Sequence, residues 1–162
     1  MRILWILAGT IVVVGLLMIA AGQFRLFSGR PPNNLGVKDG RLKPPSRTPN
    51  SVSSQADLHA GGDRKVDYAR IDPLPLQGDA AATMARLEAV VAAMPGAKII
   101  ERRDDYLYAQ FSSRLLKFVD DVEFWASPTD KVVHVRSASR VGRGDLGVNR
   151  ARIEAIRAAM TR

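Results

Sequence analysis

The chain opens on an uninterrupted apolar stretch in which no residue from Ile3 to Phe24 is charged. As a helix rising about 1.5 Å per residue, this stretch is about 33 Å long, enough to cross the hydrocarbon core of a bilayer. Trp5 and Arg25 suit its two interfaces with water. The alternative is a cleavable signal peptide with small residues at 20–22, but the apolar region of such peptides is usually only about 7–15 residues long. We therefore predict an uncleaved transmembrane anchor over residues 3–24.

Regular helical periodicity resumes at residue 79. Asp79 is a helix N-cap, and a Pro-Gly pair at 95–96 ends the helix. Apolar residues recur three and four positions apart on one face of this helix, at Ala80, Met84, Leu87, Val91 and Met94. A last helix begins with Asn149 as its N-cap and runs to about residue 160. Its buried face carries Ile153, Ile156 and Met160.

Four extended segments lie between these helices, at 97–102, 106–113, 117–126 and 131–139. Polar turns separate them, and stretches of alternating apolar and polar residues are typical of half-buried strands. We therefore predict an α+β domain over residues 79–162. It has a mainly antiparallel four-stranded sheet with two helices packed on one face, and the transmembrane helix precedes it.

The turn between the last two strands predicts their register. A turn at 127–130 that places Ala126 opposite Lys131 fixes every other pair, because side chains alternate along a strand. One face of the hairpin then carries two apolar pairs, Phe124–Val133 and Val122–Val135.

The same register brings charged residues together on the opposite face. Asp121 lies opposite Arg136 and Glu123 lies opposite His134, so that complementary charges meet. We predict an exposed cross-strand pair between Asp121 and Arg136 on the face away from the helices.

The stretch from Arg136 to Arg157 passes from a strand through three glycines into a helix and holds six arginines. This order of parts builds anion sites in many folds, because free backbone N–H groups and the helix dipole point outward there. Arg150 and Arg152, in the first helical turn, have the wrong sign for the dipole. The compensating group is either a bound anion or an internal carboxylate from Asp120, Asp145 or Glu154. The predicted anion-binding residues are Arg136, Ser137, Ser139, Arg140, Gly142, Asp145, Asn149, Arg150 and Arg152.

The amino-acid composition limits the kinds of ligand and metal site that the protein can have. The net charge of +8 favours anionic partners, although a scattered basic surface gives the same count. The chain has no cysteine, which excludes disulfides, thiolate metal sites and cysteine nucleophiles, and two histidines make a histidine-rich metal site unfavourable. We predict no metal and no cofactor. No aromatic residue lies between 136 and 162, so nucleic acid is not an expected partner.

A serine enzyme needs a nucleophile, a base within hydrogen-bond reach and an orienting acid. Asp120, Ser137 and Ser139 form a polar cluster, but the predicted register turns His134 to the other face. We therefore assign no catalytic residue, and an enzyme of unknown reaction at this cluster is an alternative.

Several long motifs resemble a bacterial and plastid family catalogued as domain of unknown function 1499. They are the segments 48–54, 118–124, 133–142, 145–150 and 152–154. The resemblance spans about residues 42–160. It implies an exported or membrane-attached domain, periplasmic in bacteria and lumenal in plastids, with no established activity. Two cysteines that are common in the family are replaced here by Pro45 and Ser51.

The resemblance also changes the organisation predicted for residues 25–78. Seven prolines lie within 28–78, with many serines and asparagines and no sustained periodicity, which is linker composition. The family match implies instead that the chain from Leu42 packs onto the domain. We predict a linker over 25–41 and an extended arm over 42–78.

The predicted protein is a single-pass protein of the bacterial inner membrane, held in the bilayer by Ile3–Phe24, with its domain in the periplasm. Basic residues that follow the span favour the cytoplasmic face as the alternative. We expect a non-enzymatic envelope module that binds an anionic ligand, a lipid headgroup or a membrane-protein partner. A structural accessory subunit of a membrane complex is a further alternative.

Overall fold

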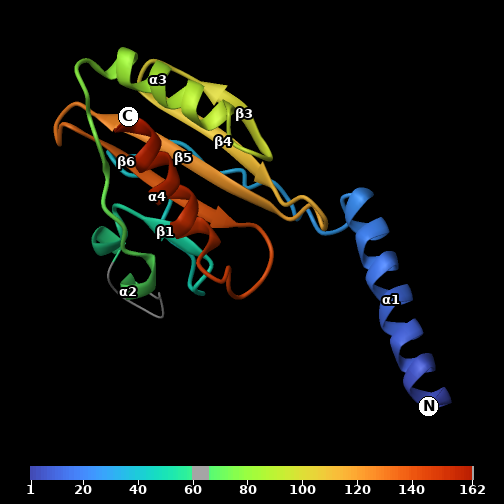
Figure 1. Ribbon diagram of the computed structural model, residues 1–162. Coiled ribbons are helices and arrows are strands. Elements are labelled where there is room, and N and C mark those ends of the chain that lie inside the picture. The colour runs from blue at the N-terminus through green and yellow to red at the C-terminus, as the bar shows by residue number, and fades with distance from the viewer. Residues whose placement is uncertain (60–65, 162) are drawn as a thin grey trace.

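A six-stranded antiparallel sheet lies at the centre of the fold in the computed structural model, which describes residues 1–59 and 66–161 (Figure 1). Residues 60–65 of the predicted arm and residue 162 of the predicted core lie outside the described residues. The strand order is β1 (Ser51–Ser53), β6 (Val132–Ser139), β5 (Val119–Ser127), β4 (Tyr106–Ser112) and β3 (Ala97–Arg102). A short strand, β2 (Leu74–Pro75), also pairs with β6.

The sheet therefore has six strands instead of the predicted four. The four long strands lie where the sequence places them, and β1 and β2 are the additions. Three and two residues are too few to show an alternating pattern, so neither short strand is readable from the sequence. Both pair with β6, which brings the segment before the first core helix onto the edge of the sheet.

The described residues form five helical segments beside the sheet. They are α1 (Arg2–Gln23), a 3-10 turn η1 (Ala56–His59), α2 (Val66–Ala69), α3 (Ala80–Ala92) and α4 (Val148–Met160). The Asp79 side chain accepts a hydrogen bond from the backbone N–H of Ala82 at 2.7 Å, which confirms the predicted cap of α3. The predicted cap of α4 is wrong: Gly147, with φ of 82°, occupies the N-cap position, and Asn149 is a buried residue of the helix itself.

One core cluster joins α3 and α4 to the sheet. Buried side chains of α3 (Met84, Leu87, Val91) and of α4 (Ile153, Ile156, Met160) belong to the same cluster as those of the strands. The strand members include Leu107 on β4, the even-numbered Val122 and Phe124 on β5, and the odd-numbered Val133 and Val135 on β6. This cluster fixes which face of each strand points to the helices.

The observed register of β5 and β6 differs from the prediction by two residues. Phe124 pairs with Val135 and Glu123 with Arg136, so each residue keeps its predicted face but has a different partner. The hairpin loop covers 128–131 because Lys131 takes a left-handed conformation with φ of 56°, and its N–H donates to the carbonyl of Ser127. A lysine gives no sequence signal for this conformation, which glycine and asparagine usually adopt.

The second face of the sheet is also covered, by the chain that leads from α1 to β1. Leu35, Val37 and Leu42 pack with Tyr106 and Tyr108 on this face. Charged residues predicted to be exposed there are therefore buried, among them Asp121, Glu123 and Arg136. The predicted exposed Asp121–Arg136 pair is wrong, because Arg136 pairs with Glu123 beneath this segment.

α1 is long and apolar enough to cross a membrane, and a helix so near the N-terminus is compatible with a membrane anchor or a signal sequence. In Figure 1 it projects away from the sheet. Its C-terminal end lies on the hairpin between β4 and β5, where the Gln23 side-chain amide donates to the carbonyl of Leu115 at 2.9 Å. A Cβ atom at Gly22 would lie 2.7 Å from the Cα of Leu116, so a glycine is required at this contact.

Candidate functional site

The glycine-rich turn before α4 is filled by a carboxylate of the chain itself. Asp145 accepts from the backbone N–H groups of Gly147 at 3.0 Å and Asn149 at 3.2 Å, and also from the side chains of Asn149 and Tyr68. Burial raises the pKa of Asp145, but these hydrogen bonds outweigh it and hold the pKa below its usual range. The backbone donors that an external anion would use at this turn are therefore taken by Asp145.

The polar cluster of Ser137 and Ser139 is organised around Asn149. The Asn149 side chain accepts from Ser137 Oγ at 2.5 Å and from Arg152 at 2.8 Å, and it donates to Ser139 Oγ at 3.0 Å. Arg152 also pairs with Asp120, which is the internal carboxylate that compensates its charge. Among the described residues, neither Ser137 nor Ser139 is hydrogen-bonded to a carboxylate or an imidazole, so the geometry is that of a buried bracing network.

Two further arginines of α4 donate to backbone carbonyls. Arg150 donates to the carbonyls of Tyr68 at 2.7 Å and Arg70 at 2.6 Å. Arg157 donates to the carbonyls of Asp72 and Pro73, each at 2.6 Å. These bonds hold the segment between α2 and β2 against α4, so both arginines have internal acceptors.

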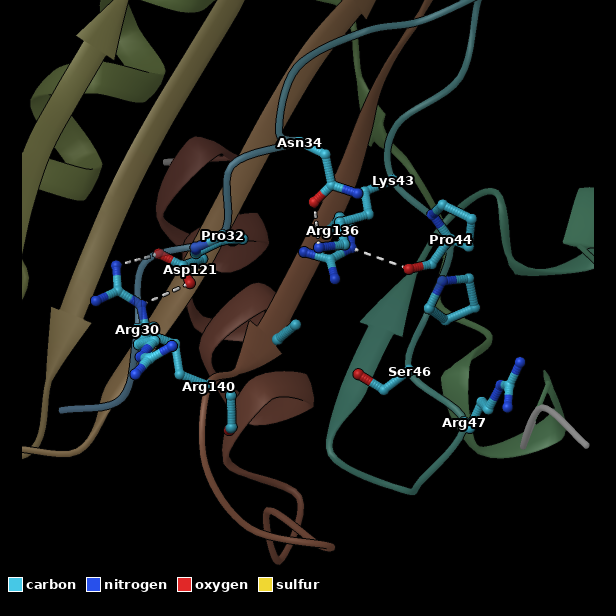
Figure 2. A pocket seen from close by; sticks show the side chains of 13 residues that line it. Arg30, Pro32, Asn34, Lys43, Pro44, Ser46, Arg47, Asp121, Arg136 and Arg140 are labelled. Carbon is cyan, nitrogen blue, oxygen red and sulfur yellow. Dashed lines mark hydrogen bonds and ion pairs between the residues drawn. The ribbon is translucent and has the colours of Figure 1, made fainter. Parts of the chain in front are cut away.

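A basic pocket opens on the other face of the sheet, between the N-terminal segment and β5 and β6 (Figure 2). Its volume is about 440 Å³. Five cationic side chains line it together with one carboxylate, that of Asp121. The cations are Arg30, Lys43 and Arg47 from the N-terminal segment, and Arg136 and Arg140 from β6 and the residue that follows it.

Arg136 is the most deeply placed of these cations, with 5% of its side chain exposed. Among the described residues its guanidinium has two acceptors, Glu123 Oε2 and the carbonyl of Pro44, each at 3.4 Å. Those distances are long for a charge-assisted hydrogen bond, which is usually about 2.7–2.9 Å. Burial lowers the pKa of Arg136 even though Glu123 and Asp121 act to raise it. The charge of Arg136 is thus incompletely compensated by the protein.

Lys43 lies close enough to Arg136 for the positive charge of the guanidinium to act on its amino group. Its amino group lies 2.5 Å from Asn34 Oδ1, a neutral acceptor. Burial, and then the charge of Arg136, lower the pKa of Lys43. Within the described parts of the chain, no carboxylate lies within 4 Å of the charged groups of Lys43, Arg30 or Arg47.

Arg140 differs from Arg136 in being fully paired. It donates to both carboxylate oxygens of Asp121, at 2.8 and 2.7 Å, and Tyr108 donates to the same carboxylate at 2.6 Å. Such a bidentate pair is strong and directional. Arg140 therefore braces the wall of the basic pocket, whereas Arg136 and Lys43 have capacity for a ligand.

The structure divides the predicted site residues between two places. Arg136, Ser139 and Arg140 line the basic pocket, and Ser137 belongs to the network around Asn149. The predicted residues 142–152 lie at the turn and the start of α4. Sequence reasoning missed Arg30, Lys43 and Arg47 because their surroundings have linker composition. The available signal is that Arg30 and Lys43 each precede a Pro-Pro pair, which fixes an extended backbone and so a definite direction for the basic side chain.

A serine, a histidine and an aspartate also meet on the edge of the sheet. His134 lies 3.2 Å from Ser54 Oγ through Nδ1 and 2.8 Å from Asp130 Oδ2 through Nε2. Ser54 Oγ, however, accepts from the backbone N–H of Val135 at 2.9 Å and lies 3.4 Å from its carbonyl oxygen. The hydroxyl thus also continues the hydrogen bonding between β1 and β6.

The comparisons with known proteins address the family and leave the ligand open. Neither the comparison with curated proteins nor that with solved structures gave a match. The family described as "Protein of unknown function (DUF1499)" matches residues 41–160, which include all six strands, α3 and α4. This range is most of the chain and agrees with the resemblance of the sequence motifs. The chain therefore belongs to the DUF1499 family.

Proposed function

We propose that this protein is a membrane-anchored, non-enzymatic module that binds a phosphate-bearing ligand in the basic pocket. The observation that carries the proposal is the buried guanidinium of Arg136, whose two protein acceptors both lie at 3.4 Å. A planar guanidinium recognises phosphate through two parallel hydrogen bonds, and a lysine adds a point charge beside it. Arg136 and Lys43 supply this pair at one place in the pocket.

Charge supports an anion over a neutral ligand. Five cations line the pocket against the single carboxylate of Asp121, which Arg140 already neutralises. Glu123, behind Arg136, also accepts from the hydroxyl of Tyr106 and the backbone N–H of Gly36. An oxyanion in the pocket would offset the repulsion between Arg136 and Lys43. Its oxygens would also accept hydrogen bonds from both cations, in place of the water molecules that burial excludes.

The membrane location rests on α1 as an uncleaved anchor. The close contact of Gly22 with Leu116 supports retention of the helix, because a segment removed at maturation has no need of a fitted contact with the domain. We propose that the domain lies on the periplasmic side, as the family resemblance implies. The basic residues after the span include Arg30 and Lys43, and a ligand site accounts for these two without a cytoplasmic orientation.

Binding of inorganic phosphate to the full-length protein in detergent tests the proposal by calorimetry. We expect salt-sensitive binding that Lys43→Ala weakens at least tenfold, since this variant removes one of the two cations beside the ligand. Lys98→Ala is the matched control: Lys98 is exposed on β3, so the variant loses the same charge elsewhere. Equal binding by both variants would refute the site.

The source of the phosphate is distinguished by a second arm of the experiment. Vesicles of phosphatidylglycerol are compared with free phosphate and with neutral phosphatidylcholine vesicles. Competition of phosphatidylglycerol with free phosphate, lost in Lys43→Ala, identifies a lipid headgroup. Phosphate binding that vesicles do not displace identifies a soluble ligand. A folded protein that binds neither contradicts the proposal and favours a structural accessory role.

A further inference from the structure

An apolar groove of about 860 Å³ lies on the helix side of the sheet, at the end where α1 joins the domain. Its apolar lining includes Phe111, Phe118, Val141, Leu146 and Val148. The last four of these side chains are also exposed to solvent. Exposed apolar side chains gathered around one groove are a feature of interaction sites.

Leu146 carries this observation further. Its side chain is fully exposed, and its backbone is in the left-handed region with φ of 51°. That conformation is unfavourable for a leucine and common for asparagine or glycine, which are also the residues expected at a solvent-exposed turn. A leucine at this position is disfavoured both by its backbone and by water. An apolar environment outside the protein would remove the second penalty.

The groove is continuous with the end of α1. The Gln23 side chain is bonded to the carbonyl of Leu115, and the ring of Phe27 lies 5.7 Å from that of Phe118, which lines the groove. If α1 spans a bilayer, its end at Gln23 lies at the membrane–water interface. The hairpin at 113–118 and the mouth of the groove then lie at the same interface.

The charges at the groove match the surface of a bilayer. Arg114 and Lys117 belong to its lining, and neither has a carboxylate within 4 Å among the residues that the structure describes. The acids in the lining are satisfied internally, because Asp120 pairs with Arg152 and Asp145 accepts hydrogen bonds from the backbone N–H groups of Gly147 and Asn149. The groove thus offers an apolar interior with cations beside it, which suits a lipid tail below a phosphate group.

We propose that this groove holds one acyl chain of a phospholipid from the bilayer that α1 crosses, with Leu146 inserted among the lipids. The inference rests on the membrane anchoring in the proposed function and does not depend on the basic pocket. The two sites lie on opposite faces of the sheet, so variants separate them.

Lipid retained by the full-length protein tests the groove. The protein is reconstituted in nanodiscs of phosphatidylglycerol and phosphatidylcholine, re-extracted in mild detergent and analysed by native mass spectrometry. We expect one bound phospholipid, reduced at least fivefold in the double variant Val141→Asn/Val148→Asn. Both changes are neutral, so net charge is unaltered. Leu58→Asn is the control, because Leu58 is 53% exposed and Val148 is 51% exposed.

Three results would overturn the inference. One is equal retention of lipid by the double variant and the control. Another is a groove filled by a second copy, seen as a lipid-free dimer that the double variant dissociates. The third is a processed protein that begins at Gln23, which would remove the anchor. By contrast, loss of phosphate binding in Lys43→Ala with retained lipid leaves the groove intact and concerns the basic pocket alone.

A second measurement remains valid if the double variant fails to fold. The chain has no cysteine, so Leu146→Cys introduces a unique labelling site at a fully exposed side chain. A fluorophore there should be quenched at least threefold more by phospholipids with a spin label on the acyl chain than one at Thr129→Cys. Thr129 is exposed in the hairpin loop between β5 and β6. Equal quenching at the two positions would contradict insertion of Leu146.

Discussion

Arg136 and Arg140 provide the most direct test of how the basic pocket works, because they are similarly buried and differently paired. Their side chains are 5% and 6% exposed. Arg140 makes a bidentate pair with Asp121 at 2.7 and 2.8 Å, whereas Arg136 meets Glu123 at 3.4 Å. Replacement of each arginine by methionine keeps the apolar stem and removes the charge.

The contacts left behind predict different losses of stability. Removing the partner of a buried carboxylate costs about 3–5 kcal/mol, and Arg140→Met leaves Asp121 with Tyr108 as its remaining short hydrogen bond. Arg136→Met leaves Glu123 Oε1 with two donors, Tyr106 at 2.9 Å and Gly36 at 2.7 Å, while Oε2 loses a contact of 3.4 Å. The variant also relieves the desolvation of a second buried charge. We expect this variant to lose about 1–2 kcal/mol and to lose phosphate binding entirely.

Urea unfolding in detergent measures both free energies. A Trp5→Phe background leaves Trp125 as the sole tryptophan, and this residue stacks on His134 within the domain. Equal losses of about 3 kcal/mol or more in both variants would mean that Arg136 also braces the fold. Phosphate binding retained by Arg136→Met would separately refute its assignment to the ligand.

Three further predictions concern Asp145, the contact of α1 with the domain, and Lys43. The lowered pKa of Asp145 means that its contribution to stability is complete above the unfolded value near ~4 and is lost as pH falls through the folded value. Asp145→Asn should therefore lower the free energy of unfolding by about 2 kcal/mol at pH 7. Below about pH 4, its urea midpoint should fall less steeply with pH than that of the wild-type protein. Gly22→Leu should lower the thermal midpoint of the domain, because a Cβ would clash with Leu116, whereas Gly9→Leu has nothing within 4 Å and should not. Phosphate should slow acylation of Lys43 between pH 7 and 9, because an anion beside it raises its pKa; an unchanged rate would contradict contact with the ligand.

The sequence predicted the elements that carry their own periodicity. Asp79 and the apolar spacing after it defined α3, and four alternating segments defined the long strands. The register failed at one residue, Lys131, because its left-handed backbone arises from the turn as a whole. Alternation also gave the faces of β5 correctly while misjudging their exposure. A strand with Asp121 and Glu123 on one face looks half-exposed, and nothing in its own sequence reports the segment that covers it.

The sequence predicted only part of the candidate site, because it does not show which distant segment covers the sheet. Arg136 and Arg140 lie in a strand and at its end, where pattern and register give each a face. Lys43 lies in a proline-rich stretch whose composition is that of a linker, and its contact with the sheet depends on residues more than 70 positions away. The glycine-rich turn showed the opposite error. Its donors resemble an anion site, but Asp145, four residues before Asn149, is close enough to occupy them.

If α1 anchors the protein in a bilayer, as proposed, the segment that covers the second face of the sheet limits how far the domain can move from that bilayer. A flexible linker over residues 25–41 would have a root-mean-square end-to-end distance of roughly 20–25 Å, and the domain could move over that range. The backbone N–H of Gly36 instead donates a hydrogen bond to Glu123, and Leu35 and Val37 pack on the sheet. This stretch is therefore held in one position against the domain. On this arrangement, the mouth of the basic pocket would keep one height and one orientation relative to the lipid surface. For the proposed membrane-anchored protein, the search for a lipid ligand would then take place in two dimensions, by lateral diffusion along the membrane and not by movement of the domain through the volume above it.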